Sequence, residues 1–340
     1  MPPRVRFGRK RIRLEPKTKH LTKSKFMKKI LVTGATGMIG AHFAKACQAA
    51  GWDVLGIARS SAASRLSGET DDKVIRCDIT DRSSLGVIFK KHRFDGVAHF
   101  AAQAFNSVSW EQEWYTHQVN TMGTMNLLNC VREYSPDATV LLACSSAEYG
   151  LATPNEGPLK EDRQLRPVSP YGVSKLATEA IGYQYFANYG MKVFLPRLFI
   201  HVGTGHPPAT AIQNFARQLA LIKKGKQAPV MNVGTLTTAR DFIDVRDGVA
   251  GLMLLQNSTM YGMPVNIATG KAHSIRFVLD TLIDISGLSV EVRQAEGLLR
   301  PSDEEVLLGD NSRLRNLGWA PQYDLRETLR EVFDDWMTRV

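Results

Sequence analysis

The sequence predicts an α/β protein, with a doubly wound parallel β-sheet that carries helices on both faces and a smaller C-terminal α/β lobe. Three observations predict this class. Short apolar segments alternate with helix-length segments from residue 27 to about residue 200, a pattern typical of parallel strands joined by crossover helices. A glycine-rich turn separates the first apolar segment from the first helix. The length of 340 residues also exceeds what one core usually serves.

The predicted strands are short segments rich in Val, Ile and Leu. The first, KILVT at 29–33, leads into the glycine turn and a helix that ends near residue 50. Similar segments separated by helix-length sequence predict further strands at 54–57, 74–77, 96–100, 139–143 and 192–196. Beyond residue 200, apolar residues recur at helical spacing, which predicts helices at 211–224, 245–255, 275–285 and 325–337.

The composition is that of an ordinary globular protein. Hydrophobic residues make up 44% and charged residues 22%, which excludes a wholly disordered chain. No apolar run approaches the length of about 18 residues that a membrane-spanning helix needs. The cysteines occur singly, without the close Cys or His spacing of a zinc site, at Cys47, Cys77, Cys130 and Cys144. We therefore expect no metal site, no disulfide and a reduced, cytoplasmic compartment.

The net charge of +10 is concentrated near the N-terminus. Residues 1–26 hold ten Lys or Arg and one Glu, so the remaining sequence is close to neutral. We interpret this segment as a disordered basic arm. Such an arm can bind RNA or an anionic membrane surface. Passive basic tails are common, however, and we expect no nucleic-acid or membrane partner.

A dinucleotide-binding turn is predicted in the sequence TGATGMIG at 33–40. Its glycines allow a tight turn and a close approach of the backbone to a pyrophosphate at the positive end of the following helix. The expected cofactor contacts here are Gly34, Gly37, Met38, Ile39 and Gly40. This turn after a strand and before a helix predicts a Rossmann-type domain over 27–200.

The end of the second strand indicates which dinucleotide binds. The sequence there has no carboxylate to accept a hydrogen bond from a free ribose hydroxyl, whereas Arg59 with Ser60 and Ser61 can hold a 2′-phosphate. NADP(H) is therefore favoured, and NAD(H) is the alternative. Further cofactor contacts are expected after the third and fourth strands, from Asp78, Ile79, Ala101, Ala102 and Gln103.

The strongest chemical signal combines a serine with a tyrosine and a lysine. Ser145 ends the strand-like sequence LLACSS, and Tyr171 and Lys175 follow in SPYGVSK. Positions i and i+4 share a helix face, so the lysine ammonium can favour the phenolate form of the tyrosine. Such a tyrosine exchanges a proton with a carbinol oxygen, and the serine can hydrogen-bond to that oxygen. This is chemistry for making or consuming a ketone.

Together these motifs resemble those of the extended short-chain dehydrogenase/reductases that act on nucleotide sugars. The likeness covers about residues 28–338 and includes HFAAQ, NTMGT, SSAEYG, RDFIDVRD and RPSDEE. Within that family, RPVSPYGVSK and LLRPSDEEVLLGDNSRLRNLGWAP are most similar to the GDP-mannose branch of dehydratases and reductases. The resemblance implies a lobe for the nucleotide sugar over 201–340, with the chain re-entering the first domain near 236–268.

The resemblance also implies roles for individual residues. Asp78 is expected at the adenine, Lys175 at the nicotinamide ribose and Ser145 at the sugar oxygen. Contacts with the nucleotide sugar are expected from Ser146, Glu148, His201, Arg240, Arg300 and Asp303. Relatives pair through two helices, near 112–132 and 170–188 here, which implies a homodimer.

The alternative for Arg240 is local. An arginine flanked by carboxylates often pairs with them, and here the neighbours are Asp244 and Asp247. An internal ion pair would leave Arg240 no role in binding the nucleotide diphosphate.

Two departures from the family pattern decide between its branches. The dehydratases carry a glutamate two residues before the tyrosine of SSAEYG, where it serves as base and acid in water loss. Ala147 holds that place here, and Glu148 is one residue away. Relatives also carry an asparagine where this chain has Ile200, which leaves the identity of the sugar open.

The sequence thus predicts an NADP(H)-dependent reductase of a 4-keto-6-deoxy sugar, most simply GDP-4-keto-6-deoxy-mannose. Dehydration of GDP-mannose or 4-epimerisation of a nucleotide sugar is the nearer alternative. A non-catalytic nucleotide-sensing or RNA-binding protein is the remote one, because a pure sensor has no need of the serine, tyrosine and lysine together.

Overall fold

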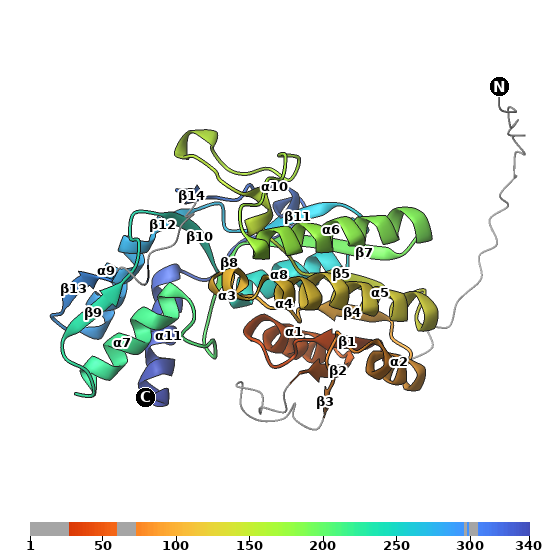
Figure 1. The fold of residues 1–340 in the computed structure, drawn as a ribbon, viewed down its shortest axis with the longest axis horizontal. Coiled ribbons are helices and arrows are strands. Elements are labelled where there is room, and N and C mark those ends of the chain that lie inside the picture. The colour runs from red at the N-terminus through yellow and green to blue at the C-terminus, as the bar shows by residue number, and fades with distance from the viewer. Residues whose placement is uncertain (1–26, 60–72, 296–297, 299–304) are drawn as a thin grey trace, which may run out of the picture.

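The fold is built around one parallel sheet, in which six strands lie where the sequence predicts them and two, at Cys144–Ser145 and Pro264–Ile267, were not predicted. The computed structural model describes residues 27–59, 73–295, 298 and 305–340, so the predicted N-terminal arm lies outside the described residues. The sheet order is β3-β2-β1-β4-β5-β7-β11, with β6 paired to β7 and every pairing parallel (Figure 1). Its strands are β1 (Lys29–Thr33), β2 (Asp53–Ala58), β3 (Val74–Arg76), β4 (Gly96–His99), β5 (Thr139–Leu142), β6 (Cys144–Ser145), β7 (Lys192–Leu198) and β11 (Pro264–Ile267).

The order of the strands identifies the place where a ligand binds. The chain runs outward from β1 to β2 and β3, and then returns to the other side of β1 with β4 and β5. This reversal makes the sheet doubly wound, which confirms the predicted fold class. In such sheets, ligands bind beyond the carboxyl ends of the strands, at the point where the order reverses. That point lies between β1 and β4.

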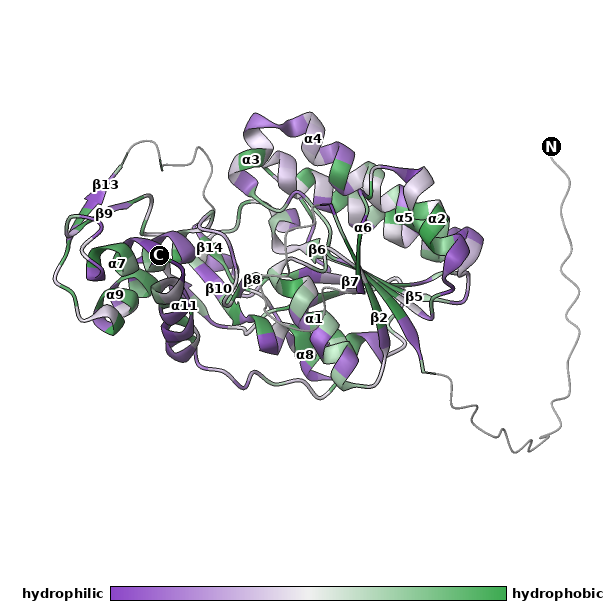
Figure 2. Cartoon of the chain, turned by 90° about the horizontal axis from the view of Figure 1, so that it is seen from below, coloured by the Kyte–Doolittle hydropathy of each residue, from purple (hydrophilic) through white to green (hydrophobic). Residues whose placement is uncertain are grey.

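Each face of the sheet is buried under its own set of helices. Side chains alternate along a strand, so Leu31 belongs to one apolar cluster and its neighbours Ile30 and Val32 to the other. The first cluster includes residues of α2 (Arg82–Lys91), α5 (Gly123–Tyr134) and α6 (Pro170–Tyr189), and the second includes residues of α1 (Met38–Ala49) and α8 (Val245–Gln256). Figure 2 shows hydrophobic residues concentrated on the central strands.

The second lobe forms a separate layer of helices and short strands. A third apolar cluster joins α7 (Ala211–Lys223), α9 (Ile275–Ser286) and α11 (Leu325–Arg339). The lobe's strands are β8 (Ile200–Val202), β9 (Val230–Val233), β10 (Ala239–Asp244), β12 (Ala272–Ser274), β13 (Glu291–Gln294) and β14 (Val306–Leu307). Between β10 and β12 the chain contributes α8 and β11 to the main sheet layer. The helices predicted after residue 200 are thereby confirmed.

Three short helices complete the described fold, namely α3 (Asn106–Glu111), α4 (Glu113–His117) and α10 (Ser312–Arg315). All four cysteines are buried and free, as expected. None of the helices in the described ranges is long and apolar enough to cross a membrane.

Candidate active site

The glycine turn after β1 has the shape of a phosphate cradle. Gly34 has a φ of +68°, and a Cβ there would lie 2.8 Å from the Ala101 nitrogen. At Gly40, a Cβ would lie 2.3 Å from the Gly34 carbonyl oxygen. Helix α1 begins at Met38, so its free N–H groups and positive end lie at this turn. The residues present therefore fit a bound dinucleotide pyrophosphate, with Ile39 in the same helical turn.

Replacing Gly40 by Ala is expected to weaken dinucleotide binding and lower the melting temperature. The added methyl group overlaps a backbone oxygen that cannot move aside without opening the turn, a cost of about 1–3 kcal/mol. Gly86→Ala on α2 is the matched control, because a Cβ there meets open space and alanine is the better helix former. Thermal melting and titration with NADPH measure both effects. Equal affinity and stability in the two variants would contradict the close fit.

The buried side chain of His99 on β4 contacts Thr33 at the end of β1, next to the glycine turn. His99 Nδ1 lies 2.7 Å from Thr33 Oγ1, and its Nε2 lies 3.1 Å from Thr124 Oγ1. Thr33 Oγ1 also accepts a hydrogen bond from Ala101 N–H at 3.1 Å. Burial lowers the pKa of His99 to about 3, so the ring is neutral. The motif HFAAQ includes this histidine, and no role for it is predicted from the sequence. A histidine in an apolar strand nevertheless indicates a buried residue with hydrogen-bond partners.

Asn120 connects the segment after β4 to helix α6. It lies in a π-helical turn, Gln118–Met122, of a type often found at functional sites. Its Oδ1 accepts Gln103 N–H at 2.8 Å, and its Nδ2 donates to Gln103 O and Ser174 Oγ at 3.0 and 2.9 Å. The side-chain amide of Gln103 donates to Phe105 O and to a threonine on α4. Gln103 and its neighbours Ala101 and Ala102 are thus fixed at the end of β4.

The residues predicted to determine the preference between NADP(H) and NAD(H), and to contact the adenine, lie at the ends of β2 and β3. Arg59 is exposed, and its guanidinium carbon lies 5.7 Å from the centre of the Tyr115 ring. Asp78 accepts hydrogen bonds from the N–H and hydroxyl of Thr80 at 2.9 and 2.8 Å, and Ile79 beside it is buried. The predicted contributions of Ser60 and Ser61 lie outside the described residues.

The predicted catalytic residues come together at the start of α6. The Ser169 hydroxyl caps this helix by accepting Gly172 N–H at 3.1 Å. This places Tyr171 and Lys175 on adjacent turns, and Lys175 Nζ lies 5.9 Å from the centre of the tyrosine ring. The lysine also donates to Ala143 O at 2.8 Å, at the end of β5.

The protonation states of these groups follow from their burial. Burial raises the pKa of Tyr171 to about 12, against the lowering effect of a hydrogen bond with Ser145. Burial also lowers the pKa of Lys175. Near neutral pH the phenol of Tyr171 therefore carries its proton. This arrangement can donate a proton to the oxygen of a carbonyl group whose carbon accepts a hydride.

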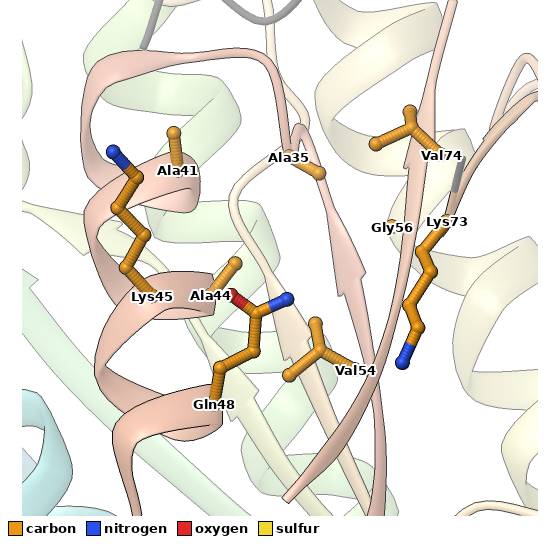
Figure 3. A pocket seen from close by; sticks show the side chains of 9 residues that line it. All are labelled: Ala35, Ala41, Ala44, Lys45, Gln48, Val54, Gly56, Lys73 and Val74. Atoms are coloured by element: carbon orange, nitrogen blue, oxygen red, sulfur yellow. The ribbon is translucent and has the colours of Figure 1, made fainter. Parts of the chain in front are cut away.

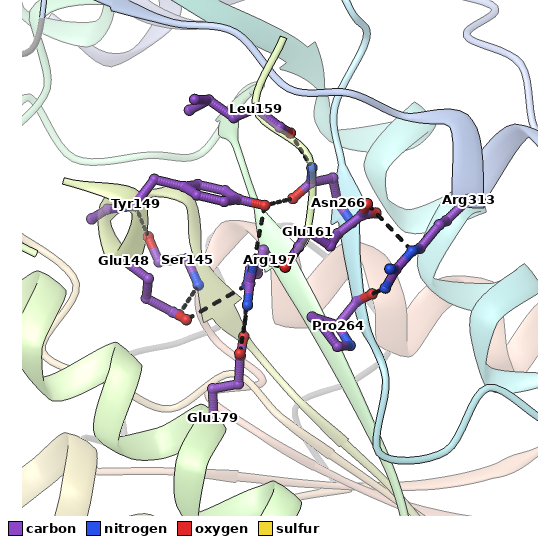
Figure 4. Close-up of polar contacts among 11 residues, drawn as sticks. Ser145, Glu148, Tyr149, Leu159, Glu161, Glu179, Arg197, Pro264, Asn266 and Arg313 are labelled. Carbon is purple, nitrogen blue, oxygen red and sulfur yellow. Dashed lines mark hydrogen bonds and ion pairs between the residues drawn. The ribbon is translucent and has the colours of Figure 1, made fainter. Parts of the chain in front are cut away.

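A buried ionic network next to Ser145 was missed by sequence reasoning (Figure 4). Arg197 on β7 is 2% exposed and binds both carboxylate oxygens of Glu179, at 2.8 and 2.6 Å. It also donates to Tyr149 Oη at 3.0 Å, and that hydroxyl donates to Asn266 Oδ1 at 2.7 Å. The available signal was an arginine in the apolar sequence KVFLPRLF, because arginine is rarely buried without a partner.

Glu148, expected to contact the nucleotide sugar, lies in the protein interior. Its side chain has no exposed surface, and its Oε1 accepts Ser145 N–H at 2.6 Å. Its Oε2 faces Arg197 Nε at 3.8 Å. The carboxyl group therefore points into the protein. The 3₁₀ turn Ser146–Tyr149 causes this orientation, because its capping box turns the glutamate back onto the serine. The neighbouring Ser146 is buried as well.

His201 lies against helix α8. A Cβ on Gly248 would lie 2.1 Å from His201 Nε2, so the ring packs directly on the helix backbone. Its Nδ1 donates to Phe199 O at 2.8 Å, and burial lowers its pKa to about 4. Nε2 is buried, and no hydrogen-bond partner for it is found among the described residues.

Arg240 lies on β10, and its Nη1 donates to Ala239 O at 2.9 Å. Asp244 and Asp247, the two possible local partners of Arg240, make other contacts. Asp244 accepts from Arg246 at 2.7 Å, and Asp247 accepts two backbone N–H groups from the segment before α11. Arg300 and Asp303 lie outside the described residues.

Two pockets differ greatly in size. A hollow between α1 and β2, lined by residues that include Lys45, Gln48 and Lys73, has a volume of about 10 Å³ (Figure 3), which is enough for about one water. A polar pocket of about 420 Å³ lies in the second lobe. It is lined by Asn214, Arg217, Gln218, Gln227, Ala228, Val230, Asn232 and Leu298.

This fold and site define an NAD(P)-dependent enzyme of the extended short-chain dehydrogenase/reductase class, as the sequence motifs indicated. A family model described as GDP-mannose 4,6 dehydratase matches residues 31–332, and the chain belongs to this family.

Different relatives are named for different reactions. The GDP-6-deoxy-D-mannose reductase of Pseudomonas aeruginosa is 30% identical over 92% of this chain and 98% of that protein. The solved structure of RMD from Pseudomonas aeruginosa complexed with NADPH has a TM-score of 0.81 at 30% identity, over 92% of this chain and all of that one. The Thermus thermophilus UDP-glucose 4-epimerase in complex with NAD has a TM-score of 0.80 at 28% identity, with the same coverage.

Proposed function

We propose that the protein reduces a GDP-linked 4-keto-6-deoxy-mannose to the 6-deoxy sugar and uses NADPH in preference to NADH. The proposal rests on one combined observation. Ser145, Tyr171 and Lys175 are all present at the start of α6 and the strand end beside it, whereas the carboxyl group of Glu148 is buried. Dehydration needs a carboxylate at the substrate, but position 147 is an alanine and the carboxyl group of Glu148 is buried. Reduction needs only a proton donor beside the ketone, which Tyr171 supplies.

The cofactor preference rests on the end of β2 and on the relatives. Arg59 offers a guanidinium suited to a 2′-phosphate, and the Pseudomonas aeruginosa relative was solved with NADPH. The Thermus thermophilus epimerase was solved with NAD, so NADH is the second candidate. Gly34, Gly37 and Gly40 would hold the pyrophosphate, and Lys175 the nicotinamide ribose.

In this mechanism the protein's own residues donate the proton and stabilise the resulting phenolate. NADPH, when bound, supplies a hydride. Tyr171 donates its proton to the oxygen at C4, and Ser145 hydrogen-bonds to the same oxygen. The ammonium of Lys175 stabilises the phenolate that Tyr171 then becomes, because opposite charges one helical turn apart attract.

The pocket of about 420 Å³ in the second lobe would receive the nucleotide. Its walls present amide groups and one guanidinium, that of Arg217, which suits a base and a phosphate. Leu298 also lines it, two residues before Arg300.

The test of this function follows NADPH absorbance with GDP-4-keto-6-deoxy-mannose, in parallel with GDP-mannose alone. We expect NADPH to be consumed one to one with a 6-deoxyhexose product. Conversion of GDP-mannose to a keto sugar without net NADPH loss would overturn the proposal in favour of the dehydratase. Interconversion of GDP sugars without either change would favour the 4-epimerase.

We also propose a cytoplasmic homodimer. Free buried thiols fit a reducing compartment. Helix α6, within the predicted pairing region, leaves the Tyr183 side chain 55% exposed and Val173 42% exposed, and exposed apolar residues often mark an interface. Light scattering is expected to give twice the chain mass of 37.7 kDa. A mass of one chain would contradict this.

A further inference from the structure

The carboxyl group of Glu148 is placed to act on Ser145 through the backbone. Its Oε1 accepts the Ser145 N–H at 2.6 Å, and the Ser145 hydroxyl in turn accepts Ala147 N–H at 3.2 Å. These two bonds close the turn that presents the serine to Tyr171. Glu148 therefore controls where the serine hydroxyl lies without touching a substrate itself.

Within the described part of the chain, the cluster around Glu148 holds two carboxyl groups, of Glu148 and Glu179, and one guanidinium, that of Arg197. Arg197 uses Nε and Nη2 on the two oxygens of Glu179, and uses Nη1 on Tyr149 Oη and on a backbone carbonyl. The distance from Arg197 Nε to Glu148 Oε2 is 3.8 Å, which is beyond hydrogen-bonding distance. The positive charge of Arg197 is thus satisfied by Glu179.

The other charged or titratable groups nearby do not neutralise Glu148. Lys175 directs its ammonium to Ala143 O at 2.8 Å. The Cys144 thiol is buried, and burial raises its pKa well above the ordinary value. The phenol of Tyr171 is protonated near neutral pH. Glu148 Oε2 is buried without a donor among the described residues, so an ionised carboxylate there would be unsatisfied.

The grouping of two buried carboxyl groups points to a shared proton. One oxygen of Glu148, one of Glu179 and the Cys144 sulfur all lie within 4.8 Å of one another. Such a cluster can bind a metal ion, but here the guanidinium of Arg197 already provides the cation. Two ionised carboxylates this close, out of water, repel strongly, and one of them keeps its proton.

We propose that Glu148 is a neutral carboxylic acid that positions Ser145, with its O–H donated to Glu179 and its carbonyl oxygen accepting Ser145 N–H. Burial and the adjacent Glu179 also raise the pKa of Glu148 well above its ordinary value. The neutral form has a catalytic consequence. A negative charge on Glu148 raises the pKa of Tyr171 and so opposes phenolate formation, whereas the neutral acid holds the serine without that cost.

The first test compares Glu148→Gln with Glu148→Ala in the reductase assay and rests on the proposed function. Glutamine reproduces both bonds of the neutral acid, with its carbonyl oxygen toward Ser145 and its NH₂ toward Glu179. We expect it to keep kcat within about threefold, whereas alanine lowers kcat at least about tenfold with a smaller change in KM. The pH profiles of the glutamine variant and the wild type should superimpose. A glutamine variant as impaired as the alanine variant would overturn the proposal, and so would a fall of the wild-type kcat at acidic pH that the glutamine variant does not show.

The second test needs no substrate and separates the two proposals. Infrared difference spectra of the wild-type protein against Glu148→Gln at neutral pH are expected to show the C=O stretch of a protonated carboxylic acid in the wild type only. Carboxylate bands in its place would show that Glu148 is ionised and overturn the proposal. This result stands even where the reductase assay fails, so the failure of one proposal is distinguishable from that of the other.

Discussion

Replacing Tyr171 by Phe is expected to lower kcat for ketone reduction by about 10²- to 10⁴-fold, the usual contribution of a positioned general acid. Phenylalanine keeps the aromatic ring near Lys175 and removes only the hydroxyl that gives the proton. NADPH oxidation in the presence of the keto sugar measures the loss. Because burial raises the pKa of Tyr171 to about 12, kcat should be flat through neutral pH and fall at alkaline pH as the phenol ionises.

The control for this variant is Tyr183→Phe on the same helix. Tyr183 is exposed, so loss of its hydroxyl should leave kcat unchanged. Thermal melting and NADPH affinity should be similar in both variants and the wild type. A Tyr171→Phe variant that is folded and retains wild-type kcat would remove Tyr171 from the mechanism.

Replacing Arg197 by Met is expected to cost about 3–5 kcal/mol in the free energy of unfolding. The substitution leaves the Glu179 carboxylate buried without its two charged hydrogen bonds, and it also removes a donor from Tyr149 Oη. Urea denaturation measures the change. The substitution is also expected to lower kcat, because Glu148 and Tyr149 belong to the turn next to Ser145.

Two further variants isolate the buried charge. Arg93→Met removes an ion pair with Asp137 whose side chains are 72% and 85% exposed, so it should change stability by less than about 1 kcal/mol. The double variant Arg197→Met with Glu179→Met should recover part of the stability lost in the single variant, because no unpaired charge remains. If Arg197→Met destabilises no more than Arg93→Met, the network does not contribute to the fold as described.

Much of the fold and the candidate catalytic residues could be predicted from the sequence, because their signals are local. Alternating apolar segments located the strands, and β1 ends at Thr33 as the KILVT pattern predicts. Glycine spacing located the cradle, and the i to i+4 spacing placed Tyr171 and Lys175 on one helix face. Each of these signals lies within about two turns of helix or one strand and its following turn.

The sequence by itself therefore determined the class of sheet, the glycine turn and the candidate proton donor. The tertiary structure decided what surrounds them. Tyr149 meets Asn266 at a separation of 117 residues, and His99 meets Thr33 at 66, and no local pattern encodes such pairs. It also decided the direction of Glu148, because a one-residue difference within a 3₁₀ turn separates a carboxyl group at the substrate from one in the core. The physical reason is that burial and charge pairing depend on which distant strands meet, whereas helix and strand periodicity depends only on neighbours.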